Sequence, residues 1–305
     1  MSLTINDAKQ VKKIDIHAHA AQYPELYPPV NSRETFISAP QVIENYDKLG
    51  VELGVLLPIA SPEGQFAPFS NEGCYQMVKQ YPGRFVWFCN VDPRAVQNNP
   101  STDLASILKF YKDLGAKGVG EITARIYADD PRTMNLFAAC EKVGLPALFH
   151  IAKDDNTNYG IIDDLGLPRI EKVLKTFPNL KLIGHSQAFW SEISADNNDQ
   201  VRGGFPTGKV TPGRITELMR KYPNLYCDLS AGSGSNAMMR DKDHAAKFMA
   251  EFSDRIFYGI DMCAPSNTHQ FTFNDFLNEM LDEGLLSPKN YVKIVRDNAK
   301  KLLEL

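Results

Sequence analysis

Short apolar segments alternate with longer amphipathic segments along the whole chain. Eight of the short segments are typical of buried strands, because each is rich in β-branched and aromatic residues and is bounded by turn-forming residues. The segments between them have helical periodicity. The predicted strands span residues 13–17, 51–57, 84–90, 118–121, 145–150, 181–185, 225–229 and 255–261.

Proline and glycine mark the ends of the predicted helices. Pro40 begins one helix that Gly50 ends, and Asp130-Pro131 begins another that ends at Gly144. Proline in the first turn and glycine just past the last turn both match the backbone geometry of helix termini. A third helix is predicted to start at Thr211-Pro212.

Similar junctions recur where a predicted helix ends and the next predicted strand begins. One type of junction ends in glycine followed by an apolar residue and occurs at residues 48–51, 113–116 and 142–145. A second type has an aromatic residue followed by proline and occurs at residues 81–83, 177–180 and 222–225. Eight strands, each followed by a helix, fit one closed (β/α)8 TIM barrel better than two open sheets. We therefore predict an α/β fold with a single domain over residues 1–305.

Three of the predicted strand-to-helix connections are long. They follow strands 1, 2 and 6 and span residues 20–39, 59–70 and 186–211. Loops of this length are usually functional, and in a barrel the loops after the strands surround the active-site mouth. We expect residues in these three loops to determine which ligand binds.

Composition narrows the classes of protein. The 305 residues include 33 Lys and Arg against 37 Asp and Glu, and 43% are hydrophobic. This balance excludes a disordered chain and argues against a nucleic-acid partner. No apolar stretch is long enough to span a membrane, and because residues 1–13 are polar we expect no secretory signal. Five scattered cysteines without CxxC spacing favour a reducing compartment, so we expect a cytoplasmic protein.

Histidines and carboxylates follow several of the predicted strands. Strict alternation in the first strand would place Asp15, His17 and His19 on one face, where two imidazoles can reach one ion. Because the carboxyl ends of barrel strands converge, polar residues at the other strand ends are expected to join them. Such a set suits zinc or another borderline divalent ion. These further residues are Glu121, His150, His185 and Asp261.

In these residues the sequence resembles the amidohydrolase superfamily. Within that superfamily it is similar to the amidohydrolase-related (amidohydrolase 2) branch. The resemblance runs from residues 15–19 to residues 297–303. It implies that His17 and His19 are metal ligands from the first strand and that His150 is a ligand from the fifth. It also implies a functional histidine at His185, and an Asp261 carboxylate that binds metal or moves protons.

The fourth strand departs from the family pattern. Many members with two metal ions carry a carbamylated lysine at its end, whereas this chain has Glu121 there and Lys117 at the opposite end. Glu121 is either a ligand, as in some relatives, or a carboxylate that supports another ligand. The resemblance implies one or two divalent ions, with zinc favoured and manganese, iron or magnesium as alternatives.

Each candidate also has a purely structural interpretation. The four strand-end histidines could be satisfied core residues, and Asp261 could be a helix N-cap. Arg125, four residues after Glu121, is predicted to bind a substrate carboxylate, although an arginine in a loop is often only a solvated charge. His244 and His269 are predicted to be uninvolved.

The segment 232–237 fits the dinucleotide-binding pattern G-x-G-x-x-A, with Asp254 near the spacing of a ribose-binding acid. This pattern normally opens the first βαβ unit, whereas here it follows the seventh predicted strand. We therefore predict a loop whose glycines let the backbone approach a ligand closely.

The resemblance implies metal-dependent hydrolysis of a C–N or C–O bond in a small amide, lactone or ester, with Asp261 or His185 moving the proton. The alternative is non-oxidative decarboxylation of an aromatic or unsaturated acid, with His185 as the acid and Arg125 or Arg94 binding a carboxylate. A second alternative is a non-catalytic or NAD-binding α/β protein. A small-molecule substrate and a homodimer are expected.

Overall fold

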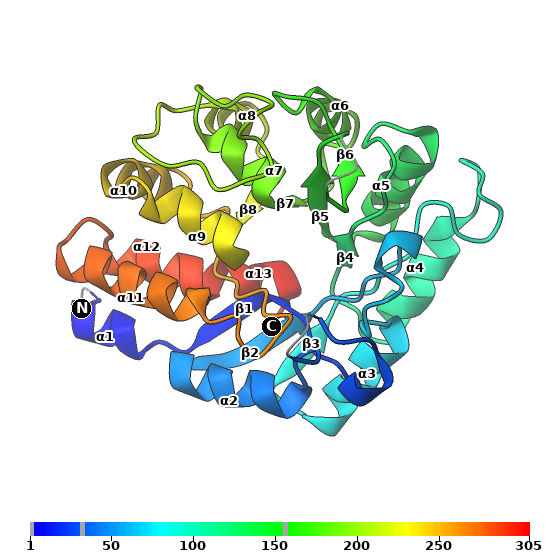
Figure 1. Cartoon of the computed structure of the whole chain (residues 1–305), viewed down its shortest axis with the longest axis horizontal. Helices are drawn as coiled ribbons and strands as arrows, with labels where there is room; N and C mark the ends of the chain where they lie inside the picture. The colour runs from blue at the N-terminus through cyan, green and yellow to red at the C-terminus, as the bar shows by residue number, and fades with distance from the viewer. Residues whose placement is uncertain (1–2, 31–33, 155–157) are drawn as a thin grey trace.

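Parallel strands form the centre of the molecule and helices surround them (Figure 1). The computed structural model describes residues 3–30, 34–154 and 158–305. Within these residues the strands are β1 (Lys13–Ala18), β2 (Val51–Leu56), β3 (Phe85–Trp87), β4 (Val119–Ile122), β5 (Ala147–Ala152), β6 (Ile161–Ile162), β7 (Leu182–His185), β8 (Leu225–Asp228) and β9 (Ile256–Phe257).

The strands form two parallel groups that hydrogen bonds join into a closed barrel. One group has the order β1-β2-β3 and the other β4-β5-β7-β8-β9, with β6 paired to β5 outside this path. The amide of Cys89, just after β3, donates to the carbonyl of Gly118 before β4 at 2.9 Å. At the other junction, the amide of Asp261 donates to the carbonyl of His17 at 2.8 Å. The predicted TIM barrel is therefore confirmed.

Helices cover the outside of this barrel. Two of the predicted boundaries are confirmed: Gly50 and Gly144 both adopt the left-handed conformation, with φ of 71° and 72°. The described helices are α1 (Ile5–Gln10), α2 (Ala39–Leu49), α3 (Asn71–Gln80), α4 (Leu104–Asp113), α5 (Pro131–Val143), α6 (Pro168–Thr176), α7 (Gln187–Trp190), α8 (Arg214–Lys221), α9 (Ala231–Met239), α10 (Lys242–Glu251), α11 (His269–Asp282), α12 (Pro288–Val292) and α13 (Asn298–Leu303).

Apolar side chains from strands around the barrel meet in one buried cluster. Ile14 of β1, Val55 of β2, Leu148 of β5, Ile183 of β7 and Phe257 of β9 belong to it. Residues of α13 pack against the same cluster. The barrel interior is thus filled, and the polar strand ends lie beyond the filled part.

Several element boundaries differ from the prediction. The eighth predicted strand is shorter, because only Ile256–Phe257 forms regular pairs, and the helix predicted from Thr211 begins at Arg214. Strand β6 lies in the connection between β5 and α6 and was not predicted. The long connection after β7 contains α7. No helix in the described part of the chain combines the length and apolar character needed to cross a membrane.

The glycine-rich segment after β8 forms helix α9, so the predicted ligand-binding loop is wrong. A Cβ atom at Gly234 would lie only 2.4–2.7 Å from the backbone of Leu229. The missing side chain therefore lets the helix pack closely on the end of the preceding strand. This packing role replaces the dinucleotide-binding interpretation of the segment.

Candidate metal centre

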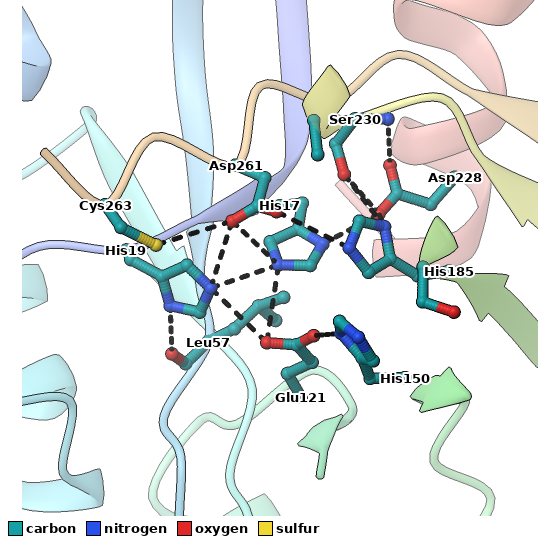
Figure 2. Close-up of polar contacts among 12 residues, drawn as sticks. His17, His19, Leu57, Glu121, His150, His185, Asp228, Ser230, Asp261 and Cys263 are labelled. Carbon is teal, nitrogen blue, oxygen red and sulfur yellow. Dashed lines mark hydrogen bonds and ion pairs between the residues drawn. The ribbon is translucent and has the colours of Figure 1, made fainter. Parts of the chain in front are cut away.

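All six predicted strand-end residues lie together at the carboxyl ends of the barrel strands (Figure 2). They come from β1, β4, β5, β7 and the segment after β9, and five of the six are almost completely buried. They are His17, His19, Glu121, His150, His185 and Asp261.

Four side-chain atoms form what we call the donor cluster: Nε2 of His17, Nε2 of His19, Oε2 of Glu121 and Oδ1 of Asp261. The two nitrogens lie 3.1 Å apart. The Glu121 oxygen lies 3.7 and 3.5 Å from these nitrogens, and the Asp261 oxygen lies 3.5 and 3.4 Å from them. Ligands held at ~2.1 Å around a tetrahedral zinc ion are themselves about 3.4 Å apart. The donor atoms of His17, His19 and Asp261 lie within 4.8 Å of one another, so their spacing fits one divalent ion, with the Glu121 oxygen next to the same two imidazoles.

The hydrogen bonds of the two imidazoles also point to a cation. Nδ1 of His19 lies 3.0 Å from the carbonyl of Leu57, which can only accept, so this nitrogen carries the hydrogen. Nδ1 of His17 lies 2.7 Å from the carboxylate of Asp228 and donates in the same way. In the neutral rings both Nε2 lone pairs then face each other, an arrangement that a bound cation stabilises.

Electrostatics in this buried site favour positive charge. Burial alone would lower the pKa of His17, but the charges of Asp261 and Asp228 outweigh it and hold that pKa well above its ordinary value. Burial would raise the pKa of Asp261, but His17 and the other imidazoles lower it well below the ordinary range. The carboxylates therefore stay ionised, and positive charge next to them is stabilised.

His185 lies beside the donor cluster. Its Nε2 is 3.4 Å from Oδ2 of Asp261, and its Nδ1 is 3.1 Å from Oδ2 of Asp228. Burial and the neighbouring His17 lower the pKa of His185, yet the two aspartates outweigh them and raise it to about 9. Donor atoms of His17, Glu121 and His185 also lie within 4.8 Å of one another, so the number of ions stays open between one and two.

His150 contacts the donor cluster through Glu121. Its Nδ1 lies 2.7 Å from Oε1 of Glu121, the oxygen that does not face the two imidazoles of β1. Among the described residues, His150 belongs to neither of the groups of three donors that converge within 4.8 Å. This position orients the Glu121 carboxylate, and direct ligation by His150 stays a prediction.

Asp228 belongs to the site and was missed in the sequence. Its Oδ2 accepts from Nδ1 of His17 at 2.7 Å and from the hydroxyl of Ser230 at 2.7 Å. A carboxylate behind a metal-binding histidine fixes the tautomer and the orientation of the ring. Asp228 is the last residue of β8, so the rule that selected the other strand ends could have selected it too.

Asp15 does not face the site, in contrast to the predicted alternation. Its carboxylate accepts from the hydroxyl of Tyr46 at 2.6 Å and from the amides of His17 and Ile260. The pairing register of β1 with β2 shifts between Asp15 and Ala18, and this irregularity breaks strict alternation. The hydrogen bonds of Asp15 therefore connect β1 to α2 and to the segment after β9.

Tyr159 lies next to the site and was not singled out in the sequence. Its ring centroid is 4.4 Å from that of His150, and the residue is 45% exposed. Burial, followed by the charges of Glu121 and Asp261, raises the pKa of its hydroxyl well above the ordinary value. Tyr159 therefore lies beside His150 with part of its surface exposed.

The predicted arginines already have protein partners. One guanidinium nitrogen of Arg125 donates to the carbonyl of Asn158 at 2.5 Å. Arg94 forms a two-point ion pair with Glu63 and a further pair with Asp92. Substrate binding by Arg125 stays a prediction, whereas the Arg94 guanidinium is occupied.

His244 lies apart from these contacts. His244 lies in α10 and stacks on Phe248, with ring centroids 6.0 Å apart. The side chain of His269 lies outside the described part of the structure.

Comparison with known families confirms the family resemblance. The sequence profile of a family described as amidohydrolase (Amidohydro_2) matches residues 14–305. The chain belongs to this amidohydrolase family. A comparison with curated proteins finds no match.

Solved structures with the same fold support the barrel assignment. An uncharacterised TIM-barrel protein from Bordetella bronchiseptica is 19% identical, with 96% of this chain and 99% of that chain covered and a TM-score of 0.64. A dihydroxybenzoic acid decarboxylase from a Polaromonas species, with bound manganese and an inhibitor, is 16% identical over 96% and 97% of the chains, with a TM-score of 0.59. A 5-carboxyvanillate decarboxylase from Novosphingobium aromaticivorans, with manganese, is 14% identical over 100% of both chains, with a TM-score of 0.60.

Proposed function

We propose that this amidohydrolase-family protein is a metal-dependent carboxy-lyase that removes CO2 from a small aromatic or unsaturated acid without oxidation. The observation that carries the proposal is the position of His185. Its Nδ1 faces Asp228 and its Nε2 faces Asp261 next to the donor cluster. An acid is thus positioned beside a site suited to binding an anionic substrate through a cation.

The donor cluster would hold the metal. His17 and His19 supply neutral imidazole nitrogens, and Glu121 and Asp261 supply carboxylate oxygens, a set that suits zinc or manganese. A bound divalent ion would act as a Lewis acid and orient the oxygens of the substrate. Asp228 keeps the His17 ring in the orientation that directs Nε2 into the cluster.

In decarboxylation the carbon that loses CO2 must receive a proton. His185 would donate it from Nε2, because Asp228 holds the Nδ1 hydrogen on the opposite side of the ring. Asp261 would stabilise the protonated ring before transfer through its Oδ2, 3.4 Å from Nε2. The net reaction consumes one carboxylate group and one proton, and it forms one C–H bond and one molecule of CO2.

Neighbouring structures supply independent support. The Polaromonas and Novosphingobium proteins of the same fold are decarboxylases of dihydroxybenzoic acid and 5-carboxyvanillate, and both were solved with manganese. A third neighbour, from Rhizobium, is a 2,6-dihydroxybenzoate decarboxylase. These neighbours support manganese, one of the alternatives expected from the sequence, as a candidate metal for this chain.

Hydrolysis is the second candidate, and the two oxygens of Asp261 favour it. Oδ1 faces His17 and His19, whereas Oδ2 faces His185. A carboxylate in this position could take a proton from a water molecule at the cluster and pass it to His185 for the leaving group. The substrate would then be an amide, lactone or ester.

One experiment separates the two reactions. The purified chain, loaded in turn with manganese and zinc, is incubated in D2O with a panel of hydroxybenzoates and a panel of lactones and esters. We expect CO2 release and a single deuterium on the carbon that carried the carboxylate, as detected by NMR. Turnover of a lactone or ester without CO2 would contradict decarboxylation and establish hydrolysis.

A further inference from the structure

The fold holds the aromatic ring of Tyr159 at the edge of the donor cluster. The ring lies over His150 at 4.4 Å with an interplanar angle of 39°. His150 in turn contacts Glu121, whose other oxygen belongs to the cluster. Only one imidazole and one carboxylate therefore separate Tyr159 from the atoms that would hold the ion.

The backbone around Tyr159 is fixed by three contacts. The amide of Gly160 donates to the carbonyl of Thr123 at 3.0 Å, and Arg125 donates to the carbonyl of Asn158 at 2.5 Å. Strand β6, which starts at Ile161, pairs with β5. These contacts fix the backbone on both sides of Tyr159, and the contact of the ring with His150 places the side chain.

Gly160 allows this segment to lie directly on the strand that carries His150. Its φ is 123°, and a Cβ atom there would lie 2.6 Å from the carbonyl oxygen of His150 and 2.9 Å from Cδ2 of its ring. No side chain fits in this space. The absence of a side chain at Gly160 therefore allows Tyr159 to pack against the imidazole of His150.

The ring of Tyr159 remains available to a ligand on its other side. The residue is 45% exposed although its ring contacts a buried histidine in a tilted arrangement. Its ring centroid lies 4.4 Å from that of His150, and His150 contacts Glu121 of the donor cluster, so the ring is held at the edge of the cluster. A tyrosine hydroxyl is protonated at neutral pH and can donate to an anion.

We propose that Tyr159 binds the substrate directly: its ring stacks on a planar, unsaturated ring of the substrate, and its hydroxyl donates a hydrogen bond to the substrate carboxylate. This inference rests on the proposed function for the choice of a planar acid. It assigns selectivity for flat substrates to a residue that lies outside the donor cluster.

The test measures binding without turnover, so that it is independent of the reaction catalysed. The probes are benzoate and cyclohexanecarboxylate, which share a carboxylate and a six-carbon ring but differ in planarity. Dissociation constants are measured by calorimetry or ligand-observed NMR on the metal-loaded chain. The variants are Tyr159→Phe, which removes only the hydroxyl, and Tyr159→Leu, which removes the ring.

Tyr127→Phe is the matched control. Tyr127 is also a partly exposed tyrosine, at 38%, but its hydroxyl already donates to Asp154 at 2.6 Å. Thermal unfolding and metal content of each variant establish that the chain folds and keeps its ion. If Tyr159→Leu does not fold, Tyr159→Phe still tests the hydrogen bond.

We expect the wild-type chain to bind benzoate more tightly than cyclohexanecarboxylate. Tyr159→Phe should weaken both acids about tenfold, as expected for loss of a hydrogen bond to a charged group. Tyr159→Leu should also abolish the preference for benzoate, and Tyr127→Phe should change neither value. Unchanged binding in both Tyr159 variants, or no benzoate binding by the wild type at millimolar concentration, overturns the inference. Benzoate binding that depends on Tyr159 in a chain that hydrolyses esters would contradict only the decarboxylase proposal.

Discussion

Oδ2 of Asp228 lies 2.7 Å from Nδ1 of His17, and the same oxygen lies 3.1 Å from Nδ1 of His185. One buried carboxylate oxygen thus orients both a candidate metal ligand and the candidate acid (Figure 2). The hydroxyl of Ser230 donates to this oxygen as well. The orientation of the two imidazoles is therefore coupled through a single group.

Asp228→Asn should weaken metal binding roughly 10–100-fold, because an amide cannot hold the His17 tautomer as a carboxylate does. Metal affinity is measured by competition with a chelator. Asp129→Asn is the control, because Asp129 pairs with Arg169 and Lys172 away from the site. Equal affinity in the Asp228 variant and the wild type would show that this carboxylate does not support the ligand.

His17→Ala should abolish both bound metal and activity, since His17 belongs to both groups of converging donors. Elemental analysis of the purified variant measures the metal. His244→Ala is the matched control, because this histidine lies in α10 and stacks on Phe248. Full metal occupancy in the His17 variant would contradict the proposed donor cluster.

Glu121→Gln should lower metal affinity more than His150→Asn does. Oε2 of Glu121 belongs to the donor cluster, whereas His150 reaches the cluster through Oε1 of Glu121. Both affinities are measured with manganese and with zinc. A larger loss in the His150 variant would indicate direct ligation by His150, as the family resemblance implies.

Gly160→Ala should destabilise the chain by about 2–4 kcal/mol, because it adds both backbone strain and a clash with the carbonyl of His150. Gly166→Ala is the control: its φ is also positive, at 83°, but a Cβ atom there has nothing within 4 Å. It should cost only ~1–2 kcal/mol of strain. Urea unfolding measures both, and equal losses would mean that the contact with His150 is not restrictive.

Lys13→Met should stabilise the chain at neutral pH. Lys13 is only 5% exposed, and burial lowers its pKa from 10.5 to about 8. Below about pH 8 both the folded and unfolded chains are protonated, so folding bears the full cost of burying the charge, about 3 kcal/mol. Loss of the hydrogen bond from Nζ to the carbonyl of Leu49 offsets ~1 kcal/mol of the gain.

The sign of the pH dependence distinguishes this effect from simple repacking. Between pH 8 and 10.5 the unfolded wild type binds more protons at Lys13 than the folded one, so wild-type stability rises with pH. The advantage of Lys13→Met in urea unfolding should therefore shrink over this range. A constant difference between the two chains would show that Lys13 is not desolvated.

Sequence periodicity predicted the barrel because strands and helices leave local patterns. Gly50 and Gly144 ended helices as expected, since each residue needs only its own left-handed backbone. The predicted loop at Gly234 failed for a different reason. Its glycine serves close packing on Leu229, and a glycine pattern alone does not distinguish such packing from ligand approach.

By itself the sequence determined that His17, His19, Glu121, His150, His185 and Asp261 stand near strand ends, because a closed barrel brings all carboxyl ends to one face. Only the tertiary structure decided which atoms meet. His17 and Asp228 are 211 residues apart, and their contact depends on barrel closure and ring orientation. The same holds for Tyr159, whose place over His150 is set by Gly160 and the pairing of β6. Such contacts leave no periodic pattern along the chain, because they are properties of the closed barrel and of side-chain geometry.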